Sequence, residues 1–171
     1  MSLTPDHRRL VLGQALGGAV VNFFLNGGVA WLTFPPIETM PMWARGNCVA
    51  GDTLGTSFFL PLITCVILTL VTRKVLRGGS MPWLPLAELP TVSRILPGNF
   101  VGRGALVGLI CALTIGLGTL GLLTLLGVEG MNRSQVAMYK AVYTVLLGLI
   151  VTPVFVWRAF ADGAPRAARA A

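Results

Sequence analysis

Charged residues are scarce in this chain: Asp, Glu, Lys and Arg make up only 11% of its 171 residues. A soluble domain carries about 25% charged residues, which keep its surface in contact with water. Hydrophobic residues amount to 54%, and they fall into blocks that reach the ~20 residues a helix needs to cross a bilayer. The composition therefore excludes an ordinary soluble domain and predicts an integral membrane protein.

Histidine and cysteine are also rare, since His7 is the only histidine and the three cysteines are Cys48, Cys65 and Cys111. Two cysteines lie inside apolar blocks and Cys48 has no partner in its own loop, so no disulfide framework is implied. Without a cluster of Cys and His we expect no metal site. The apolar blocks also lack paired carboxylates and any nucleophile–base arrangement. We therefore expect no catalytic residues, no cofactor and no enzyme.

Acidic residues are outnumbered, with 6 Asp and Glu against 13 Lys and Arg, and the formal net charge is +7. A basic chain can bind nucleic acid, but such proteins gather their basic residues on a solvated face beside base-reading groups. Here the basic residues lie at the edges of the apolar blocks, where they would meet lipid headgroups. The pattern predicts the lipid bilayer as the partner and no nucleic acid.

Four apolar blocks predict an all-α polytopic membrane protein with a single four-helix domain over residues 1–171. At ~1.5 Å rise per residue, each block is long enough to span a bilayer with some tilt. The first block is too long for the apolar part of a signal peptide and contains Asn22 and Asn26, so we interpret it as a retained helix. The predicted helices cover residues 10–34, 49–71, 104–127 and 136–157.

The distribution of Lys and Arg predicts the orientation of these helices. Ten basic residues precede the first block, separate the second from the third, or follow the fourth, and only Arg45 and Arg133 lie on the opposite side. This bias predicts that both termini and the middle loop are cytoplasmic, as in a bacterial-type inner membrane protein with two helical hairpins. The middle loop, 74–102, is rich in proline. The tail, 161–171, is expected to be disordered.

Polar residues inside the helices gather at one depth, in the half of the bilayer away from the termini. Asn22 and Asn26 are four residues apart and share one helix face, which has to meet protein or water rather than lipid. Residues of the second and fourth helices reach the same depth. We interpret the set as a ligand or ion pathway, with interhelical hydrogen bonding as the alternative. Its members are Asn22, Asn26, Thr56, Ser57, Tyr143 and Thr144.

Asp52 and Lys140 lie just beyond this set, at matched depth. One interpretation joins them as an ion pair that acts as a clamp between helices or as a gate above the polar set. The alternative keeps them apart: Asp52 caps the N-terminus of the second helix, and Lys140 extends its ammonium group to the headgroups. The choice depends on the order of the helices in the bundle, which the sequence does not determine.

Pairs of glycines four residues apart predict close helix packing. They are Gly13 and Gly17, Gly51 and Gly55, and Gly104 and Gly108.

Two functions remain for a protein of this kind. The polar set favours a small transporter, permease or channel subunit for a small polar ligand or ion. The small size, the glycine pairs and the lack of an acidic residue near the membrane centre favour a non-transporting partner, such as an assembly factor, an immunity protein or a structural subunit. We expect a homo-oligomer or a partner membrane subunit. In the case of transport, four helices enclose little space, so a pathway would form between protomers.

Overall fold

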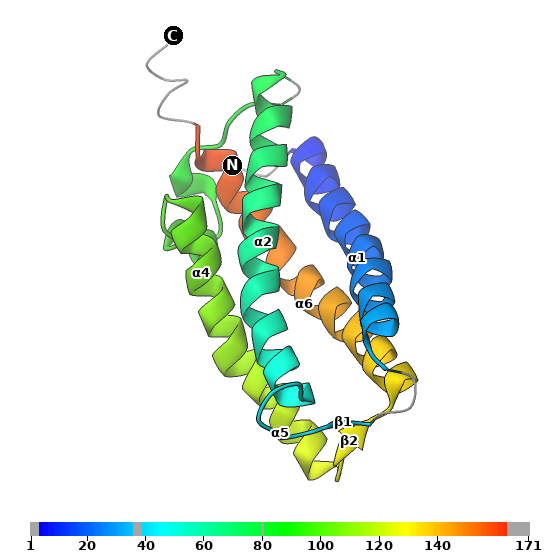
Figure 1. Ribbon diagram of the computed structural model, residues 1–171. Helices are drawn as coiled ribbons and strands as arrows, with labels where there is room; N and C mark the ends of the chain where they lie inside the picture. Colours follow the sequence, from blue (N-terminus) through cyan, green and yellow to red (C-terminus); the bar gives the residue numbers. More distant parts are fainter. Residues whose placement is uncertain (1–3, 36–38, 80, 164–171) are drawn as a thin grey trace.

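The computed structural model describes residues 4–35, 39–79 and 81–163. Four long helical spans run side by side (Figure 1), and they confirm the four helices predicted from the apolar blocks. The third span is a continuous rod of two α-helices with one π-helical turn, η2, between them. The spans are α1 (Pro5–Thr33), α2 (Val49–Arg77), α4–η2–α5 (Phe100–Cys111, Ala112–Gly116 and Leu117–Leu125) and α6 (Arg133–Ala161).

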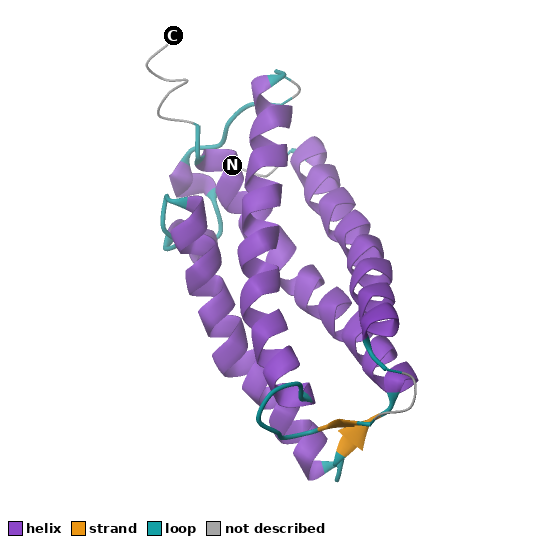
Figure 2. Ribbon diagram, in the orientation of Figure 1, coloured by secondary structure: helices purple, strands orange, loops and turns teal. Residues whose placement is uncertain are grey.

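Short elements close the two ends of the bundle (Figure 2). At one end, β1 (Met40–Pro41) pairs antiparallel with β2 (Gly130–Met131). We call this the ribbon end. At the other end, which holds the start of α1 and the end of α6, the connection between α2 and α4 carries η1 (Leu86–Glu88) and α3 (Thr91–Arg94). We call this the terminal end.

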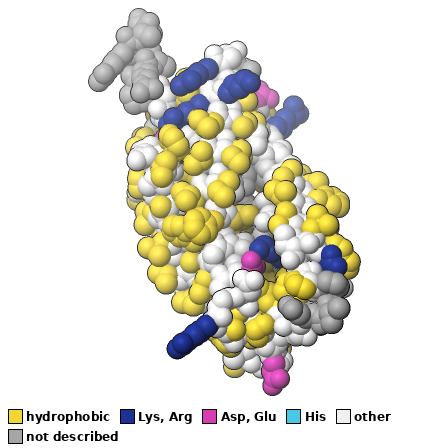
Figure 3. All heavy atoms as spheres, viewed as in Figure 1, with side chains coloured by type: hydrophobic (Ala, Val, Ile, Leu, Met, Phe, Trp, Pro, Cys, Tyr) yellow, Lys and Arg dark blue, Asp and Glu magenta, His cyan; other side chains and the backbone are white. Residues whose placement is uncertain are grey.

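All four spans are long and apolar enough to cross a membrane. Their 26 to 29 residues correspond to about 39 to 44 Å of helix, more than the ~30 Å of a hydrocarbon core. Apolar side chains cover much of the flank of the bundle, whereas Lys and Arg gather at the terminal end (Figure 3). These features are consistent with a multi-pass membrane protein.

Capping residues set where the helices begin. Thr4 caps α1 ahead of a proline at the first helical position, and Asn99 caps α4. Asn132 and Gln135 form a reciprocal capping box at the start of α6, which satisfies two otherwise free backbone donors. The observed helices start three to five residues before the predicted bounds in three of the four spans, because these polar cap residues lie outside the apolar blocks.

The helices do not pack as two sequential hairpins. The main contacts of α1 are with α6, and α2 packs between α6 and α4. Glycines allow the close approaches: an added Cβ at Gly27 would lie 2.9 Å from Cβ of Ala141, and one at Gly108 would lie 2.4 Å from the carbonyl oxygen of Phe58. The order across the bundle is therefore α1, α6, α2 and α4.

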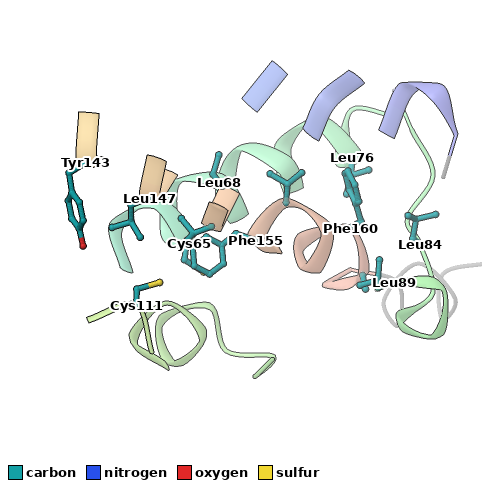
Figure 4. Close-up of a cluster of buried hydrophobic side chains, with 13 residues drawn as sticks. Cys65, Leu68, Leu76, Leu84, Leu89, Cys111, Tyr143, Leu147, Phe155 and Phe160 are labelled. Atoms are coloured by element: carbon teal, nitrogen blue, oxygen red, sulfur yellow. The ribbon is translucent and has the colours of Figure 1, made fainter. Parts of the chain in front are cut away.

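The larger buried core follows α6 toward the terminal end, where the connection between α2 and α4 packs against it (Figure 4). Phe155 and Phe160 are fully buried there, beside Leu84 and Leu89 of the connection. The amide of Leu84 also donates to the carbonyl of Phe160. The proline-rich segment is thus packed on the bundle, and Ile95 is among its exposed apolar residues.

Two predicted boundaries at the terminal end are corrected. The loop predicted at 74–102 begins at Gly78, because α2 continues through Arg77. In the tail predicted at 161–171, Ala161 still belongs to α6, and the side chain of Asp162 is only 2% exposed with its carboxylate in ion pairs. Residues 164–171 lie outside the described part of the chain.

Candidate functional site

The structure joins Asp52 of α2 to Lys140 of α6 in a salt bridge. The two helices adjoin, so the matched depth of the two residues becomes direct contact between the ammonium group and the carboxylate. The side chains are 30% and 18% exposed, respectively. The N-cap of α2 is Cys48, whose sulfur accepts from the amide of Gly51 at 3.3 Å. Asp52 therefore lies within the first turn, and its predicted alternative role as the capping residue is wrong.

Two pockets meet at this salt bridge. The first, which we call the ribbon pocket, has a volume of about 310 Å³ and lies between the end of α1, β1 and the starts of α2 and α6. The second, which we call the membrane cleft, has a volume of about 400 Å³ and opens between α1 and α2. Both pockets are lined by Asp52 and Lys140. The ion pair therefore borders both a space at the ribbon end and a cleft along α2.

The membrane cleft brings together some of the predicted pathway residues. Asn26 lines it from α1 and Thr56 from α2, beside the ion pair. Apolar side chains such as Phe59 and Ile63 complete its wall. The cleft thus offers an amide, a hydroxyl, a carboxylate and an ammonium group in a mostly apolar surrounding, which is the composition of a site for a small polar molecule.

Asn22 and Thr144 lie beside the cleft but bond to each other's helices. The amide nitrogen of Asn22 donates to the carbonyl oxygen of Thr144 at 3.5 Å. The hydroxyl of Thr144 lies 2.8 Å from the carbonyl oxygen of Lys140 in its own helix and 3.3 Å from the carbonyl oxygen of Asn22. Gly148 makes room for this contact, because a Cβ there would lie 2.6 Å from the amide nitrogen of Asn22. These two residues hold α1 on α6.

Ser57 and Tyr143 are buried in contact with each other, away from the cleft. Their hydroxyl oxygens are 2.5 Å apart, and Ser57 donates to the carbonyl of Thr53. One helical turn closer to the ribbon end, the hydroxyls of Thr53 and Tyr139 are 2.8 Å apart. The two tyrosine rings stack with their centroids separated by 5.6 Å. This ladder of hydroxyl pairs fastens α2 to α6.

Sequence reasoning missed Thr53 and Tyr139 as members of this ladder. A signal was present, because each lies four residues before a predicted site residue and so shares its helix face. The predicted set of eight residues therefore divides into three groups. Asn26, Thr56, Asp52 and Lys140 line the membrane cleft, Asn22 and Thr144 join α1 to α6, and Ser57 and Tyr143 join α2 to α6.

Within residues 4–35, 39–79 and 81–163, no group of three or more His, Cys, Asp and Glu side chains is placed to hold a metal ion. Among known proteins, no family model, curated protein or solved structure matches this chain. The function is therefore argued from the geometry of the ion pair and its two pockets.

Proposed function

We propose that this protein is a small transporter, permease or channel subunit that admits a small polar ligand or ion through the membrane cleft. The Asp52–Lys140 pair acts as the gate between the cleft and the ribbon pocket. The observation that carries the proposal is that both residues line both pockets. A solute that passes from one pocket to the other has to displace the pair or pass beside it.

The chemistry of the gate suits a polar solute. Both charged side chains are partly withdrawn from water, where electrostatic interactions are stronger than in bulk solvent. A solute with its own donors and acceptors can replace the contact between the two groups, with Asn26 and Thr56 as further partners. An apolar solute would leave the separated charges unpaired, which is strongly unfavourable.

The orientation belongs to the same proposal. The excess of Lys and Arg at the terminal end supports a cytoplasmic position for both termini and places the ribbon end outside, in a bacterial-type inner membrane. Reporter fusions after Arg77 and at the C-terminus are expected to be cytoplasmic, and a fusion near Met40 external. An external C-terminus would contradict this orientation.

Flux through reconstituted protein tests the transport function. Proteoliposomes are challenged with gradients of glycerol, urea, glycine and potassium chloride, and their volume is followed by light scattering. We expect at least one probe to cross faster than in protein-free liposomes, and Lys140→Met to change that rate at least threefold. Lys74→Met, an exposed lysine at the terminal end, is the matched control. Equal rates with and without protein for all four probes would contradict transport.

A second function, a subunit that binds another membrane helix, is favoured by the glycine pairs. Gly104 and Gly108 pack closely on α2, as predicted. Around Gly55, which lines the membrane cleft, and around Gly13 and Gly17, an added Cβ would meet no described atom within 4 Å. Among the described residues, the Gly13 and Gly17 face and the surface at Gly55 are thus open, whereas a Cβ at Gly51 would lie 3.4 Å from Sγ of Cys48. If another helix packs at Gly55, Gly55→Leu should weaken that association, which is measured by the size of the protein particle in detergent. If the cleft admits only solute, the substitution should leave the particle size unchanged.

A further inference from the structure

A cluster of three arginines from three helices surrounds one aspartate at the terminal end. Arg73 of α2 and Arg103 of α4 donate to Oδ2 of Asp162 at 3.0 and 2.9 Å. Arg158 of α6 donates to Oδ1 at 2.7 Å. We call these residues the arginine cluster. Arg73 and Arg103 lie 89 and 59 residues from Asp162 in the sequence, whereas Arg158 lies four residues from it.

The arginine cluster carries two positive charges in excess of its single carboxylate. Arg103 is fully buried, and Arg158 and Asp162 have side chains only 10% and 2% exposed. Buried charges are ordinarily balanced by opposite charges, because an unpaired charge out of water is strongly unfavourable. Both oxygens of Asp162 are already engaged, so this residue has no further oxygen for the excess charge.

Several donors of the cluster are also unsatisfied. Within the described chain, Nε and Nη1 of Arg103 and Nε of Arg73 are buried without a hydrogen-bond partner. Buried donors are nearly always bonded to protein or water, because an unmade hydrogen bond costs about 1 to 3 kcal/mol. The free donors show that the cluster lacks a hydrogen-bond partner among the described residues, and the excess charge favours an anion in that place.

The cluster can be reached from one side. Arg73 keeps 22% of its side chain exposed, and its guanidinium lies 5.7 Å from the centroid of the Phe100 ring. Arg73 is four residues from the end of α2 and Arg103 is the fourth residue of α4. The cluster is therefore about one helical turn, ~5 Å, inside the ends of these helices. Since the spans are longer than a ~30 Å hydrocarbon core, this depth is close to the headgroup layer expected for a membrane-spanning bundle.

We propose that the arginine cluster binds a phosphate group, presented by the headgroup of an anionic phospholipid. Guanidinium groups match phosphate oxygens with paired, charge-assisted hydrogen bonds, and basic pockets between membrane helices bind phospholipid headgroups. The phosphate meets the exposed edge of Arg73 and is held by the uncompensated charge of Arg103 and Arg158 behind it. This site lies at the opposite end of the bundle from the Asp52–Lys140 gate and does not depend on the proposed transport function.

Native mass spectrometry and thermal unfolding of the purified protein in detergent test the proposal. The probes are phosphatidylglycerol, phosphatidylcholine and inorganic phosphate. We expect phosphatidylglycerol to stay bound at least fivefold more than phosphatidylcholine and to raise the melting temperature further. Binding of phosphatidylglycerol but not of inorganic phosphate supports a lipid ligand, and the reverse assigns the site to free phosphate. An absence of both responses would overturn the site.

Two matched variants separate a specific site from general attraction. Arg73→Gln should reduce phosphatidylglycerol retention at least fivefold, whereas Arg77→Gln, an exposed arginine one turn further along α2, should change it less than twofold. Arg73→Lys keeps the charge and the fold but loses the planar donor pair, so it should give an intermediate loss. Equal losses from Arg73→Gln and Arg77→Gln would overturn the proposal, as would a drop in melting temperature that is identical with and without phosphatidylglycerol.

Discussion

The coupling between Asp52 and Lys140 can be measured with a double-mutant cycle. Asp52→Asn and Lys140→Gln each remove one charge while keeping a similar side-chain volume, and the double variant removes both. If the pair contributes to stability, each single variant leaves the other charge partly buried and without its partner. The double variant should then be more stable than the sum of the two single effects predicts.

The expected magnitude follows from the burial of the pair. Fully exposed pairs contribute about 0.2 to 1 kcal/mol, whereas removing one partner of a buried pair costs about 3 to 5 kcal/mol. With side chains 18% and 30% exposed, the coupling should lie between these limits, at about 1 to 2 kcal/mol. For a chain of this length, 1 kcal/mol shifts the melting temperature by about 2 to 4 °C. The coupling should therefore appear as about 2 to 8 °C.

The assay is thermal or denaturant unfolding of the four proteins in one detergent. Asp52→Asn combined with Lys74→Gln provides the control, because Lys74 lies at the terminal end and should not couple to Asp52. Additivity within about 0.5 kcal/mol for Asp52 and Lys140 would refute the argument. The pair would then contribute nothing to the bundle, and the gate would lose its energetic basis.

Three further substitutions test the packing. Gly108→Ala places a Cβ 2.4 Å from a backbone oxygen of α2 and should destabilise the protein by about 1 to 3 kcal/mol. Gly118→Ala should be neutral in the same unfolding assay, because the space around Gly118 is open among the described residues. Asn22→Leu should lower the melting temperature more than Phe24→Leu, because Asn22 bonds to α6 and Phe24 is 71% exposed; equal shifts would contradict an inward-facing Asn22. Tyr143→Phe removes a buried hydroxyl contact with α2 and should cost about 1 kcal/mol, so an unchanged melting temperature would show that this ladder is not stabilising.

The four spans could be predicted from sequence because the length of an apolar block depends only on neighbouring residues and on the thickness of a bilayer. The helix ends were less predictable. Arg73 and Arg77 lie beyond the apolar block of the second span but remain in α2, because a helix can continue into the headgroup region with basic residues in its last turn.

The order of the helices could not be predicted. It depends on contacts such as Gly27 against Ala141 and Asn22 against Gly148, which join residues more than 110 positions apart. Depth alone correctly placed Asp52 and Lys140 at one level, but their contact required α2 and α6 to adjoin. For Asp162 the sequence showed only the i,i+4 spacing to Arg158, because its other two partners, Arg73 and Arg103, come from α2 and α4.

The contacts between α2 and α6 bear on the proposed gate, because α2 stays attached to α6 when the ion pair alone separates. These helices are joined at the ribbon end by the Asp52–Lys140 pair, next by the hydroxyl ladder, and at the terminal end by the arginine cluster. If the ion pair separates, the two other connections still hold α2 on α6.

The remaining wall of the proposed gate is formed by α1. It lines both pockets. Its polar contacts with α6 include the Asn22–Thr144 contact near the middle of the span and, at the ribbon end, Nε of Arg133, which donates to the carbonyl oxygen of Trp31 at 2.6 Å. A change in the tilt of α1 on α6 would therefore widen or close the membrane cleft while α2 stays in place. Because the Asn22 contact lies next to the cleft, a substitution that weakens it should alter passage through the gate as well as stability, whereas loss of a contact in the hydroxyl ladder should alter stability alone.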